Sequence, residues 1–284
     1  MMTPTVAPLI QQLQTAGEAA GFQVTRFGRV GLEAQWPLLG MTRPALAPGP
    51  RSQHIYLSAG IHGDEPATSQ AILELLQNDA LPPTHHYYIC PLLNPAGLAN
   101  GTRENPDGID LNRDYRDFVS QETRQHAAWI QAHIPQLDCA LHLHEDWESQ
   151  GFYLYEIQLP LHSSHPQAGK PQCSLAQRIL AATEKHLPTE TATEIDGFPA
   201  QDGIIRIEVE LQLEAGQPEA LCLQASFGGS NYTLETPSAM EFRKRVDTLK
   251  AAVLAAIQTE PQKNVVTRTK KHGNVQHPTS NVQC

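Results

Sequence analysis

Short apolar runs alternate with helix-type segments along most of the chain. The run HIYLSAG at 54–60 predicts a strand. The next segment, 66–77, predicts a helix because Ala71, Leu75 and Leu76 recur on one face. We predict further strands at 22–36, 86–93, 137–147, 152–159, 204–211, 220–226 and 231–236. We predict further helices at 6–20, 121–134, 173–187 and 239–258, and a long polar loop at 94–118.

Strands that alternate with helices are typical of an α/β domain with a mixed, largely parallel, twisted sheet flanked by helices. The chain has 284 residues, of which 40% are hydrophobic, and this is enough to bury the core of a single domain. We assign residues 1–260 to this domain. The polar, basic segment 261–284 is predicted to be a disordered tail.

Composition excludes several partners. The net charge of -10 disfavours binding to nucleic acid. Membrane insertion is not expected, because no apolar stretch is long enough to span a bilayer. The first residues have the pattern of an amphipathic helix rather than a signal peptide. The five cysteines are scattered and odd in number, without CxxC spacing, so we expect reduced thiols and a cytoplasmic protein.

The turn after strand 54–60 carries residues that bind metals. It reads GIHGDEP and contains His62 and Glu65, with Gly60 and Gly63 to permit a sharp bend. A solvated turn would explain the same residues. Catalytic zinc sites, however, typically use three protein ligands and leave one position open, so a third ligand from another segment would favour the metal interpretation.

The predicted strand 137–147 offers two candidates for that third ligand, His142 and His144. They are two residues apart, so both point to the same face of a strand, and periodicity does not choose between them. Sites in open α/β sheets form beyond the carboxyl ends of strands, and His144 is nearer that end. Position therefore favours His144, and His142 would orient a neighbour by a hydrogen bond.

Four motifs in order resemble the zinc carboxypeptidase family, which includes bacterial peptide amidases and N-acyl amino acid deacylases of the aspartoacylase and succinylglutamate desuccinylase type. The motifs are HGDE at 62–65, NPAGLANGTRENPDGIDLNRDY at 94–115, LHLHEDW at 141–147 and NYTLETPS at 231–238. The resemblance covers about 55–240. The resemblance implies the zinc-carboxypeptidase fold.

The resemblance also implies a role for each matching residue. His62, Glu65 and His144 would hold one Zn²⁺. The remaining roles are Glu235 as general base, Arg103 as the cation that polarises the scissile carbonyl, Asn112 and Arg113 as the clamp for a substrate carboxylate, and Asp110 as the carboxylate behind His62. Each residue type suits its role: carboxylates accept protons, guanidinium groups bind oxyanions and carboxylates, and a ligand histidine needs an oriented ring.

Structural roles are the alternatives for these residues. Glu235 would then be a surface strand residue, Arg113 would form a salt bridge with Asp114 or Asp117, and Asp110 would shape a turn. Arg103 lies in a loop rich in glycine, asparagine and proline.

We therefore expect zinc-dependent hydrolysis of an amide or peptide bond next to a free carboxylate, as in carboxypeptidases. An N-acyl amino acid deacylase is the first alternative. Those relatives usually add a C-terminal β domain, and this chain ends with one helix and a tail, which favours the peptidase or amidase side. A metal-binding relative without catalysis is the second alternative.

The chain also departs from the family pattern: His142 stands at an often acidic position, and a tyrosine expected before the general base is missing.

Overall fold

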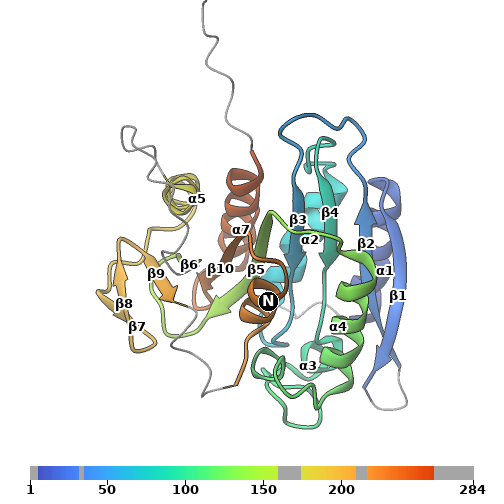
Figure 1. The fold of residues 1–284 in the computed structure, drawn as a ribbon. Coiled ribbons are helices and arrows are strands. Elements are labelled where there is room, and N and C mark those ends of the chain that lie inside the picture. The colour runs from blue at the N-terminus through green and yellow to red at the C-terminus, as the bar shows by residue number, and fades with distance from the viewer. Residues whose placement is uncertain (1–5, 32–34, 159–173, 209–215, 259–284) are drawn as a thin grey trace, which may run out of the picture.

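The computed structural model describes residues 6–31, 35–158, 174–208 and 216–258. Within these residues, ten strands form one mixed sheet in the order β1-β2-β4-β3-β5-β10-β6-β9-β8-β7, with β1 and the β7–β8 hairpin at opposite edges (Figure 1). The strands are β1 (Gln23–Val30), β2 (Trp36–Arg43), β3 (His54–Ser58), β4 (His86–Cys90), β5 (Cys139–Asp146), β6 (Tyr153–Gln158), β7 (Glu194–Ile195), β8 (Phe198–Gln201), β9 (Ile204–Glu208) and β10 (Ser230–Pro237).

Parallel pairing is concentrated at the centre of the sheet. The strands β4, β3, β5 and β10 run parallel to one another, whereas β1–β2, β2–β4 and β6–β10 are antiparallel. The expected α/β domain with a mixed sheet and flanking helices is therefore confirmed. The four central strands end at the same edge, where α/β proteins place their sites.

Helices cover both faces of the sheet. One buried core packs residues of α1 (Val6–Ala19), α2 (Pro66–Gln77), α5 (Leu175–Thr183) and α7 (Phe242–Ile257) against the sheet. On the other face, α4 (Gln121–His133) and α6 (Glu219–Phe227) contribute to two further cores. No helix among the described residues is long and apolar enough to cross a membrane.

Strand β5 shows why the two faces differ. Leu141 and Leu143 point into the core under α2 and α7, and Ala140 packs on the opposite face. His142 and His144 alternate with the leucines, so both histidines belong to the α4–α6 face. In the segment LHLH, the two leucines therefore pack into the core on one face of the sheet, and the two histidines lie on the other face.

Two sequence expectations were wrong. Residues 220–226, predicted as a strand, lie in α6, because a short apolar run fits a buried helix as well as a strand. The predicted loop 94–118 contains α3 (Pro95–Asn100) and the 3₁₀ helix η2 (Leu111–Arg113). The predicted domain limit at 260 stays a prediction, and the tail from 261 lies outside the described residues.

The loop from β3 to α2 is held against α3. Gly60 adopts a positive φ of 61°, and its carbonyl accepts a hydrogen bond from Asn94 N. Gly63 N donates to Arg103 O, and a Cβ built on Gly63 would lie 2.0 Å from the carbonyl carbon of Gly97. Only a residue without a side chain fits at position 63 in this arrangement.

We predict that Gly63→Ala lowers the free energy of unfolding by about 1–3 kcal/mol, because the new methyl group overlaps backbone. Gly49→Ala is the matched control, since a Cβ there has open space. Chemical denaturation measures both. Equal stability of the Gly63→Ala and Gly49→Ala variants would show that the loop does not pack as described.

Candidate metal centre

Three central strands carry the candidate site at their carboxyl ends. His62 and Glu65 follow β3, whereas His144 lies in the last part of β5. Glu235 on β10 stands directly opposite His144 in the parallel register. Segments that are far apart in the chain thus meet at one edge of the sheet.

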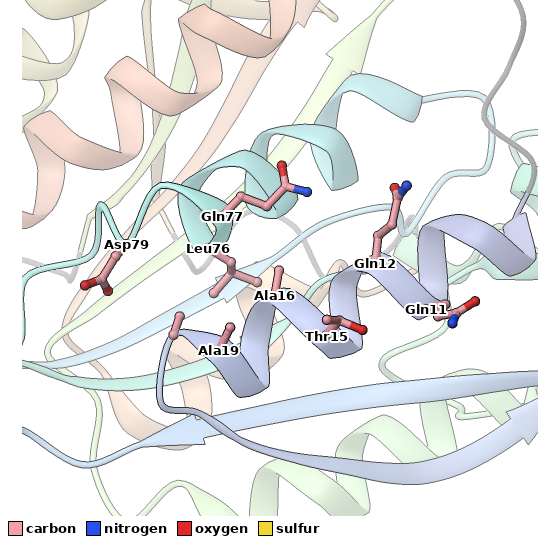
Figure 2. A pocket seen from close by; sticks show the side chains of 9 residues that line it. Gln11, Gln12, Thr15, Ala16, Ala19, Leu76, Gln77 and Asp79 are labelled. Carbon is pink, nitrogen blue, oxygen red and sulfur yellow. The ribbon is translucent and has the colours of Figure 1, made fainter.

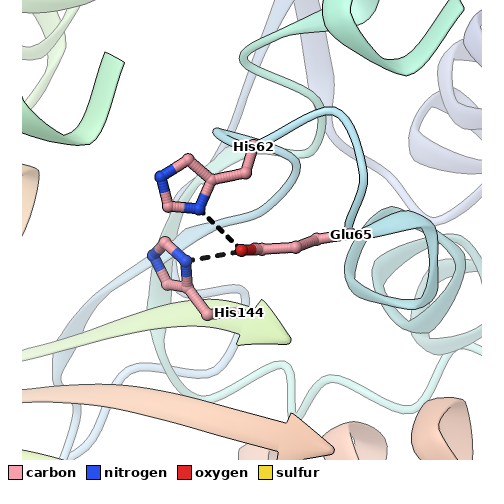
Figure 3. Close-up of side chains that lie close together, drawn as sticks. All are labelled: His62, Glu65 and His144. Carbon is pink, nitrogen blue, oxygen red and sulfur yellow. Dashed lines mark hydrogen bonds and ion pairs between the residues drawn. The ribbon is translucent and has the colours of Figure 1, made fainter. Parts of the chain in front are cut away.

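The side chains of His62, Glu65 and His144 converge on one point (Figure 3). His62 Nδ1 lies 2.6 Å from Glu65 Oε1, and His144 Nδ1 lies 3.1 Å from Glu65 Oε2. One potential ligand atom from each residue falls within 4.8 Å of the other two, and all three residues are buried. The three residues are called the ligand cluster below.

The ligand cluster fits a zinc ion. Two imidazoles and one carboxylate form a common donor set of catalytic zinc sites. Glu65 Oε2 is buried and has no partner with hydrogen-bond geometry among the described residues, although His144 Nδ1 lies 3.1 Å away, so its lone pairs are available to an ion between the two side chains. Burial opposes ionisation of Glu65, but His62 and His144 outweigh it and lower its pKa to about 2. Burial also lowers the pKa of His144 and favours the neutral ring that binds metals.

Asp110 and Arg103 lie directly behind the ligand cluster. Asp110 Oδ1 lies 3.1 Å from His62 Nε2 and accepts a hydrogen bond from Asn112 N, so it fixes the ring of His62. Arg103 Nε and Nη2 both lie 3.1 Å from Asp110 Oδ2. Burial disfavours the charge on Asp110, but His62 and Arg103 lower its pKa. The roles of Asp110 in orienting His62 and of Arg103 in binding a carbonyl oxygen stay predictions.

Arg103 also faces the centre of the site. Its Nη1 lies 3.3 Å from His62 Nδ1 and 3.9 Å from Glu65 Oε1. The side chain is 38% exposed, so part of the guanidinium remains open to solvent. A cation in this position is able to stabilise negative charge that develops on a carbonyl oxygen beside the ligand cluster.

Glu235 is partly buried on the same face as His144, between β5 and β6. Burial raises its pKa well above the usual range, and the carboxylates of Glu65, Asp146 and Asp196 add to this rise. A carboxyl group with a raised pKa is a stronger base once ionised, which suits proton transfer near neutral pH. The general-base role stays a prediction.

Asn112 and Arg113 do not contact the ligand cluster through any described hydrogen bond. Asn112 Oδ1 accepts from Glu219 N at the start of α6, 3.0 Å away. Arg113 is exposed, and its Nη1 donates to Asn112 O. Neither alternative ion pair of Arg113, with Asp114 or Asp117, is present in the described structure; Asp117 pairs with Arg116 instead. The clamp role of both residues stays a prediction.

His142 belongs to a separate polar network. Its Nδ1 lies 3.0 Å from Ser58 Oγ and 3.1 Å from Glu219 Oε2. Tyr56 OH donates to Glu219 Oε1 over 2.5 Å, and Ser58 Oγ donates to Glu219 Oε2. Burial opposes the charge of Glu219, but His142 and the other partners lower its pKa to about 2. His142 is thus oriented by Glu219 and lies outside the ligand cluster.

Sequence reasoning missed Glu219 because residues 220–226 were interpreted as a strand. It also missed Glu145, which follows His144 and is buried on the opposite face of β5. An acidic residue inside a buried strand was the available signal, since charged residues are rarely buried without a partner. Glu219 and Glu145 each bridge segments of the site.

A surface groove is lined by residues of α1 and of the end of α2 (Figure 2). Its lining reaches Leu76 and Gln77 at the far end of α2, roughly 16 Å along the helix from Glu65. Asp79 is its only ionisable lining residue. Because this groove offers no set of metal ligands or general bases, we place the chemistry at the strand ends.

The family follows from comparison with known proteins. The model of the succinylglutamate desuccinylase/aspartoacylase catalytic domain matches residues 51–212, more than half of the chain. The chain therefore belongs to this family. The matched range includes the ligand cluster, Arg103 and Asp110 and ends before Glu235. No match is found among curated proteins.

Solved structures show the same fold at low sequence identity. A candidate metallopeptidase from Shewanella denitrificans OS217 has a TM-score of 0.70 and 22% identity, with 88% of each chain covered. A metallo-carboxypeptidase from Burkholderia cenocepacia has a TM-score of 0.60 and 19% identity, covering 87% of this chain and 66% of the other. Bovine thrombin-activatable fibrinolysis inhibitor has a TM-score of 0.62 and 13% identity, covering 90% and 96%. The zinc-carboxypeptidase fold is thus confirmed.

We predict that His144→Ala lowers zinc affinity by several orders of magnitude, because it removes a nitrogen of the ligand cluster. His142→Ala should cost less, at most about 10–100-fold, since His142 contacts Ser58 and Glu219 rather than a residue of the ligand cluster. Competition with a chromophoric chelator measures both constants. If His142→Ala strips the metal while His144→Ala keeps it, the assignment is reversed.

Proposed function

We propose that this protein is a zinc-dependent hydrolase that cleaves an amide bond next to a free carboxylate. The observation that carries the proposal is the convergence of His62, Glu65 and His144, with Glu235 in register beside His144. A zinc ion held by the ligand cluster would supply Lewis acidity and lower the pKa of water toward neutrality.

The protein's own groups would supply the remaining chemistry. Glu235 would take a proton from the attacking water and pass it to the leaving nitrogen. Arg103, between Asp110 and the ligand cluster, would hold the carbonyl oxygen as it becomes negative. Asn112 and Arg113 would orient the substrate through its carboxylate, with two parallel hydrogen bonds from the guanidinium. These roles suit hydrolysis of a substrate that carries both an amide and a nearby negative charge.

The family match favours N-acyl amino acids as substrates, because the family includes succinylglutamate desuccinylase and aspartoacylase. The C-terminal peptide bond, which the sequence motifs favour, is the second candidate because it has the same amide and the same free carboxylate. A panel of N-acetyl amino acids, N-succinyl amino acids and dipeptides, each as free acid and as amide, separates the two. We expect hydrolysis of free acids, loss with a chelator, and recovery with zinc. Full activity in metal-free protein would contradict the proposal.

Glu235→Gln should lower kcat by roughly a hundredfold or more while zinc and substrate still bind, because glutamine is nearly isosteric but does not accept the proton. Glu156→Gln on β6 is the control. It changes a carboxylate that pairs with Arg206 and accepts from Tyr232 OH. Steady-state kinetics and zinc content should be measured on both variants. Turnover within a few-fold of wild type would exclude Glu235 as the base.

Arg113→Ala should raise KM about tenfold or more for free-acid substrates and leave amide substrates nearly unchanged, because only the free acid uses the guanidinium. Arg116→Ala in the same loop is the control; Arg116 is exposed and paired with Asp117. The measured quantity is the ratio of KM values for each acid and its amide. An equal loss for both substrates would show that Arg113 is structural.

A further inference from the structure

Helix α2 begins at a candidate metal ligand. Glu65 is its N-cap residue but makes no side-chain capping hydrogen bond. Its carboxylate points instead toward His62 and His144 (Figure 3). A helix start leaves backbone N–H groups without partners, and the N-cap side chain usually accepts one of them. Another group must therefore accept a hydrogen bond from the backbone N–H groups in the first turn of α2.

Glu145 supplies it from a different strand. Ala67 N, in the first turn of α2, donates to Glu145 Oε1 over 2.6 Å. Glu145 directly follows His144 in β5, and its side chain is fully buried on the opposite face of the strand. Glu145 is thus one residue away from the candidate ligand His144. The group that it binds, Ala67 N, is two residues away from the candidate ligand Glu65.

The second carboxylate oxygen of Glu145 is also occupied. Arg245 of α7 donates from Nη1 to Glu145 Oε2 in a short contact. The Arg245 side chain is only 12% exposed, and its guanidinium lies 5.3 Å from the centre of the Phe242 ring. A buried carboxylate is stable only with such partners. Glu145 is therefore fixed between α2 and α7 and has little freedom to move.

We propose that Glu145 is a positioning residue that sets the distance between Glu65 and His144 and thereby the zinc affinity of the ligand cluster. The inference rests on the proposed zinc site. Glu65 and His144 come from separate elements, and the pairing of β3 with β5 ends at Ser58, before Glu65. The Ala67–Glu145 hydrogen bond ties the ligand-bearing start of α2 to β5 beyond that point.

A purely structural role is the rival explanation, because Glu145 also links α2 to α7. Glu74 provides a matched control for that link. It lies on α2, and its carboxylate oxygens each lie 2.8 Å from a cation of α7, Arg243 and Lys250. Glu74 is nine residues beyond Glu65 and has no described contact with the ligand cluster. A variant of Glu74 therefore weakens the same pair of helices without touching the ligands.

The test measures zinc affinity by competition with a chromophoric chelator on the full chain, with thermal unfolding of the metal-free protein recorded in parallel. We expect Glu145→Gln to lower zinc affinity about 10–100-fold, because the amide nitrogen meets the Arg245 donors and displaces the side chain. Glu145→Asp keeps the charge but shortens the reach to Ala67 N and should also lower affinity. Glu74→Gln should change affinity less than about threefold.

The outcomes separate the two hypotheses. Wild-type zinc affinity in both Glu145 variants would overturn the positioning role and leave the proposed zinc site unaffected. An equal loss in Glu74→Gln would also overturn it and assign the effect to the cohesion of α2 and α7. Failure of the wild-type protein to bind zinc would overturn the proposed function and this inference together. Glu145→Asp keeps the test valid if Glu145→Gln does not fold, because it keeps the negative charge that offsets Arg245.

Discussion

The parallel pairing of β3 with β5 is the constraint on which the candidate metal centre depends. Ser58 pairs with His142, so β3 ends two residues below the level of His144. The chain must then turn at once for His62 and Glu65 to reach the ring of His144. The positive φ of Gly60 and the contact of Gly63 with the backbone of α3 permit that turn. A shift of one residue in the register would move His144 to the other face of the sheet.

The same convergence buries several charged groups, and each has partners that offset the loss of water. Glu65 lies between two imidazoles, Glu219 between two hydroxyl groups and His142, and Glu145 between a helix N-terminus and Arg245. Carboxylates buried in this way resist displacement, because moving one leaves an unpaired charge in the protein interior. The polar groups therefore make the site rigid, which catalysis requires of its ligands and bases.

Sequence patterns predicted the elements with a clear period. The helix 66–77 agrees with α2 because its apolar positions recur at helical spacing. Closeness to the strand end singled out His144 over His142, and the structure places His144 with His62 and Glu65. The apolar segment LCLQASF, by contrast, has no period that separates a strand from a buried helix. Glu219 was missed with it, since its burial depends on Tyr56 and Ser58, more than 160 residues earlier in the chain.

We propose that one zinc ion binds between the loop after β3 and the end of β5. The most direct test is an anomalous diffraction map at the zinc edge from crystals of the zinc-loaded protein. We expect a single strong peak coordinated by His62 Nδ1, His144 Nδ1 and the carboxylate of Glu65, with His142 still bound to Glu219. A peak coordinated by His142, or no ordered zinc among these residues, would contradict it.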